Sequence, residues 1–277
     1  MGFERNAAGL LLKMCADGVK LDRVLTLGHQ DVHLDLGDYN RVLRRMGRPP
    51  VGTLPSYANE LLLAMGATSV HSMDASGYER ASLTHDLNRV ISTDLNERFD
   101  LVFDGGTLEH VFDFPTAIKN CMRMVKPGGR FVSVTTPNNW CGHGFYQFSP
   151  ELFYRVFCAD NGFSIREMYV AEVDGTAFAV KDPAAIGARV ELCNTKPVYL
   201  LVHARRDAVC EIFAKTPQQS DYVVHWGSAT RSGAKPAGAW KGYPGIRQLR
   251  TFLRAKRYLR QRSLGNRAVF TPADLSF

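Results

Sequence analysis

Residues 98–153 read RFDLVFDGGTLEHVFDFPTAIKNCMRMVKPGGRFVSVTTPNNWCGHGFYQFSPELF and decide the fold. The segment opens with a mostly apolar run at 99–103, the length of a buried strand, and 114–125 carries apolar residues at helical spacing. Lys-Pro-Gly-Gly at 126–129 is typical of a helix end, and 130–135 has the composition of a second buried strand. A strand, a helix and a second strand form a βαβ unit, in which the two strands are parallel.

Polar residues follow both strands of this unit. Asp104, Gly105 and Gly106 come directly after the first strand, and a loop at 136–147 follows the second. Ligands of open parallel sheets bind at the carboxyl ends of the strands, and a loop so rich in Asn, Gly, His and aromatic residues is costly to order. His143 lies in this loop between two glycines, and its unperturbed pKa suits proton removal near neutrality.

These motifs also resemble a known family. FDLVFDGGTLEHV at 99–111, KPGG at 126–129 and the Pro-Asn loop after the second strand are similar to class I S-adenosylmethionine-dependent methyltransferases, especially the branch that methylates small molecules and sugars. The likeness covers roughly residues 22–206. It implies S-adenosyl-L-methionine as cofactor. It also implies an α/β, Rossmann-like, doubly wound fold, with a mostly parallel seven-stranded sheet and helices on both faces.

The resemblance implies a set of cofactor-binding residues at the strand ends. Asp74 would accept hydrogen bonds from the ribose hydroxyls. Asp86 would accept from the adenine amine, or else cap the following turn, and Leu87 would pack on the adenine ring. The methionine end of the cofactor would be lined by Gly28, Asp104, Gly105 and Gly106.

The first turn departs from the family pattern. It reads Gly28-His29-Gln30-Asp31, without the second and third glycines, and Thr26 stands where an acidic residue is usual. A side chain at each later position restricts the close backbone approach that glycine permits. A catalytically inactive, methyltransferase-like binding module is therefore an alternative to an enzyme.

The leading hypothesis is methyl transfer from S-adenosylmethionine to an oxygen of a small-molecule or glycan acceptor. His143 would be the catalytic base, and Asn139, Tyr146 and His110 would bind the acceptor; a purely structural role is the alternative for His110. A nucleic-acid methyltransferase is a further alternative, disfavoured because the body of the chain carries no basic stripe. No GxGxxG follows the first strand, which disfavours a dehydrogenase.

The chain divides into a methyltransferase-like domain at 1–206, with a helical insertion at about 31–66, and a basic extension at 207–277. Residues 222–273 contain eleven Lys and Arg and no acidic residue; because the whole chain has a net charge of +7, the rest is mildly acidic. The extension combines a linker at 228–245 with an amphipathic helix at 246–264, which would bind an anionic membrane surface, a protein partner or its own domain. We expect the domain to fold without the extension.

Composition excludes several other classes. The six cysteines form no CxxC pair, so we expect no metal site, and reduced thiols indicate a cytoplasmic protein. No apolar run approaches the ~18–20 residues of a membrane span, and the first residues lack an export signal. Peripheral attachment through the basic extension is compatible with both observations.

Overall fold

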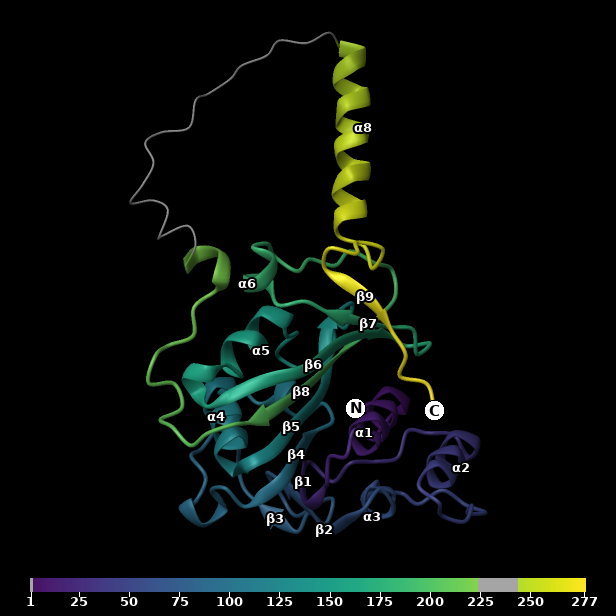
Figure 1. Cartoon of the computed structure of the whole chain (residues 1–277), viewed down its shortest axis with the longest axis vertical. Helices are drawn as coiled ribbons and strands as arrows, with labels where there is room; N and C mark the ends of the chain where they lie inside the picture. The colour runs from purple at the N-terminus through teal and green to yellow at the C-terminus, as the bar shows by residue number, and fades with distance from the viewer. Residues whose placement is uncertain (1, 224–243) are drawn as a thin grey trace.

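The computed structural model describes residues 2–223 and 244–277, and a mixed β-sheet runs through them (Figure 1). Its nine strands lie in the order β3-β2-β1-β4-β5-β8-β6-β7-β9. Neighbours from β3 to β5 are parallel, whereas β8 is antiparallel to both β5 and β6. The strand bounds are β1 Asp22–Leu27, β2 Ala67–Asp74, β3 Leu83–Thr84, β4 Phe99–Asp104, β5 Val125–Asn138, β6 Phe163–Glu172, β7 Ala177–Val180, β8 Val198–Arg206 and β9 Phe270–Ala273.

Helices cover both faces of this sheet. Buried side chains of α1, α2 and α3 pack in one hydrophobic cluster, and those of α4 and α5 pack in another. Successive residues of β4 alternate between them: Leu101 and Phe103 join the first cluster and Val102 the second, as strand geometry requires. The helix bounds are α1 Arg5–Ala16, α2 Leu36–Arg45, α3 Asn59–Ala64, α4 Phe114–Met124, α5 Pro150–Val156, α6 Pro183–Ile186 and α8 Pro244–Gln261, with 3-10 turns η1 Thr93–Leu95, η2 Leu108–His110 and η3 Ala159–Asn161.

The doubly wound α/β architecture with helices on both faces is confirmed, but the seven-strand count is too small. β7 and β9 pair antiparallel to each other beyond β6 and so extend the sheet. β7 lies in a segment that the sequence shows as an irregular excursion, because its four residues carry little periodic signal. Over residues 2–223 and 244–277, none of the helices combines the length and apolar character needed to cross a bilayer.

Local sequence signals set the starts of the helices around the sheet. Asp113 precedes α4, and its side chain accepts a hydrogen bond from the Thr116 backbone N–H. Ser149 caps α5 in the same way through the Leu152 N–H, followed by Pro150 in the first turn. Both arrangements satisfy N–H groups that a helix leaves unpaired.

The segment predicted as a helical insertion contains α2 and α3. It is joined to the turn after β1, because Asp31 forms an isolated bridge with Tyr57 and the His29 ring stacks on the Tyr57 ring at 3.5 Å between centroids. The insertion therefore packs against the turn that the family resemblance assigns to the cofactor.

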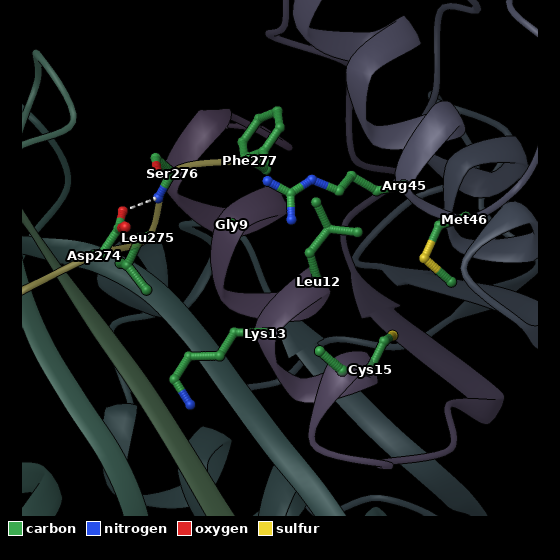
Figure 2. Close-up of a pocket in the computed structure, with 11 residues that line it drawn as sticks. Gly9, Leu12, Lys13, Cys15, Arg45, Met46, Asp274, Leu275, Ser276 and Phe277 are labelled. Carbon is green, nitrogen blue, oxygen red and sulfur yellow. Dashed lines mark hydrogen bonds between the residues drawn. The ribbon is translucent and has the colours of Figure 1, made fainter.

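The predicted boundary at 207 is wrong for the last residues of the chain. β9 pairs with β7, and Leu275 and Phe277 are buried beside α1. A side chain at Gly9 of α1 would collide with the Leu275 carbonyl. Figure 2 shows the C-terminal residues along α1, next to a cavity of about 480 Å³ that the end of α2 also lines. The amphipathic helix is present as α8, whereas most of the expected linker lies outside the described residues.

This arrangement predicts that the end of the chain contributes to stability more than α8 does. Phe270 of β9 is fully buried, so Phe270→Ala should lower the free energy of unfolding by about 3–5 kcal/mol. Leu253 of α8 is 52% exposed, and Leu253→Ala should change it by about 0.5 kcal/mol or less. Urea unfolding followed by circular dichroism measures both values. Equal effects of the two substitutions would contradict the assignment of β9 to the main domain.

Candidate active site

The carboxyl ends of β1, β4 and β5 meet at one edge of the sheet. Leu27 at the end of β1 lies in register with Asp104 at the end of β4, which in turn lies in register with Ser133 of β5. From β1 the chain continues into β2 on one side, while β4 lies on the other. A reversal of strand order of this kind opens a crevice at which ligands of doubly wound sheets bind.

The Asp104 side chain supports this edge from inside the protein. One carboxylate oxygen accepts hydrogen bonds from the backbone N–H groups of Thr107 (2.8 Å) and Leu108 (3.2 Å). The other accepts from the Ser133 hydroxyl at 2.7 Å. Burial raises the pKa of Asp104, and these hydrogen bonds oppose that rise. The Asp104 carboxylate is buried and hydrogen-bonded within the protein. The surface that follows it at this edge is therefore the backbone of Gly105 and Gly106.

The turn after β1 is fixed to its neighbours on both sides. Gly28 has φ +73°, a conformation that favours glycine, and its N–H donates to the Met73 carbonyl of β2 at 2.7 Å. The Thr107 hydroxyl donates to the Leu27 carbonyl at 2.8 Å. Thr26 is buried, and its hydroxyl donates to the Gly28 carbonyl at 2.8 Å. Thr26 therefore stabilises the turn from within and does not face a ligand.

The Gln30 side chain folds back into the space between the first turn and the end of β4. Its amide nitrogen donates to the Leu27 carbonyl. Its amide oxygen lies against Gly105, where any side chain would collide with it. A side chain at Gly28 would come within 3.3 Å of the Gln30 amide nitrogen. Gln30 thus stands where the family's second glycine would leave open space.

The residues assigned to ribose and adenine lie at the ends of β2 and β3. Asp74 ends β2, is partly exposed, and accepts one hydrogen bond from the Ser76 N–H at 3.2 Å. Asp86 is partly exposed; hydrogen bonds from Asn88 are the largest cause of its lowered pKa. Leu87 differs from the expectation, because its side chain is buried in the hydrophobic core and leaves little surface for an adenine ring.

The loop at 136–147 brings His143 against η2. The His143 and His110 rings lie edge to face, with centroids 4.8 Å apart. His143 Nε2 lies 3.7 Å from Glu109 Oε1. Gly144 has φ +70°, and a side chain there would come within 2.7 Å of the Glu109 carbonyl oxygen. That carbonyl accepts a hydrogen bond from the Phe145 N–H at 2.7 Å, which closes the loop onto η2.

The Glu109 carboxyl group lies in a buried polar cluster. Both of its oxygens are buried without a hydrogen bond of normal geometry, as are the hydroxyls of Thr135 and Thr136. Burial and then the nearby Asp104 raise the pKa of Glu109 to about 8, although the Thr135 hydroxyl opposes the rise. Buried polar atoms without partners mark places where a ligand or water completes the structure.

His143 has the opposite shift. Burial is the largest cause of its lowered pKa, and the neighbouring His110 adds to it. At neutral pH the imidazole of His143 is therefore uncharged and able to accept a proton, while Glu109 is protonated.

Two residues predicted to bind an acceptor also hold the loop in place. Asn139 donates from its side-chain nitrogen to the Asn194 and Lys196 carbonyls, at 3.1 and 2.7 Å. The Tyr146 hydroxyl donates to the Phe112 carbonyl at 2.6 Å. Their polar groups are thus engaged within the protein, whereas His110 is exposed beside His143.

Four residues at this edge were not among the candidates predicted from the sequence. Glu109 and Gln30 are buried there, and the rings of Phe112 and Phe145 form an exposed edge-to-face pair at 5.8 Å. The sequence shows that Glu109 precedes His110 and that Gln30 stands in place of a glycine. It does not show in which direction the side chains of Glu109 and Gln30 point.

Comparison with known proteins agrees with this geometry. Residues 51–133 match a family model described as a methyltransferase domain. Residues 51–133 therefore belong to a methyltransferase domain. Two curated relatives, both named ubiquinone biosynthesis O-methyltransferase, are 28% identical (Nitrobacter winogradskyi) and 30% identical (Bradyrhizobium diazoefficiens) over 138 residues. These alignments cover 50% of this chain and 45% and 47% of the relatives, so the chain spans about half the length of the curated relatives it matches.

Solved structures with a similar chain path have low identity. The 1,6-didemethyltoxoflavin-N1-methyltransferase of Burkholderia thailandensis has a TM-score of 0.42 and 15% identity, covering 74% of this chain and 78% of its own. The N-methyltransferase NodS of Bradyrhizobium japonicum has a TM-score of 0.40 and 15% identity, covering 74% and 97%. The strand order of this chain itself defines its doubly wound fold.

The raised pKa of Glu109 predicts how stability depends on pH. Glutamate ionises near 4.5 in the unfolded chain and at about 8 in the folded one, so between these values the unfolded chain binds fewer protons and stability falls as pH rises. Glu109→Gln removes this loss. Relative to wild type, the variant should therefore gain about 1.4 kcal/mol of stability for each step of one in pH between about pH 5 and pH 8.

Urea unfolding at a series of pH values measures this difference. The exposed Glu60 of α3 provides the control, because Glu60→Gln should give a difference that is nearly constant with pH. A Glu109→Gln difference that is also constant with pH would contradict a buried, protonated Glu109.

Proposed function

We propose that the chain transfers a methyl group from S-adenosylmethionine to an oxygen atom of a small-molecule or glycan acceptor. The main support for this proposal is the uncharged imidazole of His143, which lies beside the buried Glu109 and next to the glycine-lined ends of β1 and β4. The curated relatives are named as O-methyltransferases, which favours oxygen over nitrogen or carbon as the acceptor atom.

The residues at the strand ends fit this cofactor. Gly28 and Gly105 present backbone without side chains at the ends of β1 and β4, with the Gln30 side chain lying against both. Asp74 and Asp86 offer carboxylate oxygens near the ends of β2 and β3, suited to the hydroxyl and amine donors of adenosine. Gly106, with φ +93°, turns the chain after β4. The cofactor, when bound, supplies an electrophilic methyl group on sulfur.

His143 would then take the proton of the acceptor hydroxyl. Its Nε2 is buried and faces Glu109, which leaves Nδ1 for an acceptor. Removal of the proton makes the acceptor oxygen a stronger nucleophile, and the oxygen–methyl bond forms as the methyl–sulfur bond breaks. The Glu109 carboxyl group, 3.7 Å from Nε2, would hold the imidazole in the orientation that presents Nδ1 to the acceptor. The protein otherwise contributes by aligning the two reactants.

A catalytically inactive binding module is the second candidate function. Gln30 favours it, because the side chain fills space between Gly28 and Gly105 that the cofactor would need. The two candidates differ in a simple way. The enzyme binds S-adenosylmethionine and releases methylated acceptor, whereas an inactive module releases none.

The basic extension is proposed to set location or partner choice. Leu253, Tyr258 and Leu259 of α8 are exposed and lie among Arg and Lys residues. This mixture suits an anionic membrane surface or an acidic protein partner. Figure 1 shows α8 extending away from the sheet, where either would have access to it.

The first test of this function is cofactor binding by calorimetry. Asp74→Ala should weaken the binding of S-adenosylmethionine and S-adenosylhomocysteine by about tenfold to a hundredfold, since a hydrogen bond to a charged group contributes about 1.5–3 kcal/mol. Asp94→Ala, at an exposed acidic residue in η1, is the control and should leave affinity unchanged. Absence of binding by the wild-type chain at millimolar ligand would remove the proposed activity.

The second test concerns the base. With methyl-labelled S-adenosylmethionine and a panel of phenols and sugars, His143→Ala should lower turnover by ~10²–10⁴-fold while cofactor affinity stays the same. His110→Ala, at the neighbouring exposed imidazole, should lower it much less. If His110→Ala abolishes methyl transfer and His143→Ala does not, the roles of the two histidines are reversed.

A further inference from the structure

Gln30 occupies an unusual position for a long polar side chain. It follows Gly28 by two residues, and its own carbonyl accepts a hydrogen bond from the Ala58 N–H of the helical insertion at 2.9 Å. This anchor holds the backbone outward while the side chain turns back over the strand ends. Only 4% of Gln30 is exposed.

The nitrogen and the oxygen of the Gln30 side-chain amide differ in their hydrogen bonding. The nitrogen donates to the Leu27 carbonyl, which also accepts from the Thr107 hydroxyl at 2.8 Å. The oxygen is buried against Gly105 and has no hydrogen-bond partner among the described residues. A buried carbonyl oxygen without a donor is unfavourable, so the inward position of this side chain is only partly stabilised.

The Gln30 amide nitrogen resembles a ligand's donor group. It lies at the reversal of strand order between β1 and β4, where ligands of this fold bind. S-adenosylmethionine carries donors on its adenine, ribose and amino-acid parts. Asp74 and Asp86 account for the first two in the proposed function, so the ammonium group is the remaining donor. It would need the Leu27 carbonyl and the slot beside Gly105, both of which Gln30 uses.

We infer that Gln30 is a specificity-determining residue that competes with the amino-acid part of the cofactor for the slot between Gly28 and Gly105. This inference rests on the proposed function, since it concerns the same cofactor. Binding of the whole cofactor displaces the Gln30 side chain and exchanges its hydrogen bond to Leu27 for one from the ligand. A ligand with the same adenosine but no amino acid leaves Gln30 in place.

The experiment compares two ligands by isothermal titration calorimetry on the full chain. S-adenosylhomocysteine contains the amino-acid part, whereas 5′-methylthioadenosine has the same adenosine and thioether sulfur without it. Gln30→Ala should bind S-adenosylhomocysteine about tenfold more tightly than wild type, the scale of one hydrogen bond. Its affinity for 5′-methylthioadenosine should be unchanged.

Two further variants make this result specific. Gln30→Leu keeps the volume of the side chain and should show no gain for S-adenosylhomocysteine. Gln218→Ala alters an exposed glutamine that has no part in the site and should change neither affinity. Thermal unfolding of each variant establishes that it is folded, and Gln30→Gly replaces Gln30→Ala if the latter is not.

The possible outcomes separate the two proposals. If Gln30→Ala weakens S-adenosylhomocysteine binding, or changes both affinities equally, Gln30 does not compete for the slot and the inference is overturned while the proposed function stands. If Gln30→Ala binds S-adenosylhomocysteine more tightly than the wild type does, and both bind 5′-methylthioadenosine equally, the inference is supported. If no variant binds either ligand, the proposed function fails and the inference fails with it.

Discussion

The hydrogen bonds of the buried Asp104 carboxylate are the constraint on which the rest of the site depends. They join the end of β4 to the Ser133 hydroxyl of β5 and to the first N–H groups of the following loop. A buried carboxylate is unfavourable unless its oxygens are bonded, so the loop is held in the one conformation that bonds them. That conformation starts η2 and places Glu109 and His110 at the strand ends.

Glu109 connects η2 to the loop at 136–147. Its carbonyl accepts from the Phe145 N–H, and its carboxyl group lies beside His143. The other side of the loop is tied to β8, because the Trp140 indole N–H donates to the Val198 carbonyl at 2.8 Å. The position of His143 is therefore set by contacts from β4, β5 and β8 together. Burial, and after it the nearby Asp104 carboxyl group, raises the pKa of Glu109 to about 8.

The C-terminal strand completes the far edge of the sheet. An exposed edge leaves a row of unpaired backbone groups, and β9 pairs with β7 and covers them. The residues after it bury Leu275 and Phe277 against α1 and its cluster. The beginning and the end of the chain thus stabilise each other, although α8 between β8 and β9 stands apart (Figure 1).

The sequence by itself determined the elements whose signals are local. The βαβ unit of β4, α4 and β5 and the helical insertion follow from hydrophobic spacing. The strand-end positions of Gly28, Asp74 and Asp104 follow equally, because a site at parallel strand ends is a property of the topology.

Only the tertiary structure decided the features that depend on partners distant in sequence. The pairing of β9 with β7, the burial of Leu87 and the inward turn of Gln30 leave no periodic trace, because each is set by the space that other elements leave. The same holds for Glu109, whose pKa is raised by burial and by Asp104, and so depends on how the folded chain excludes water around it.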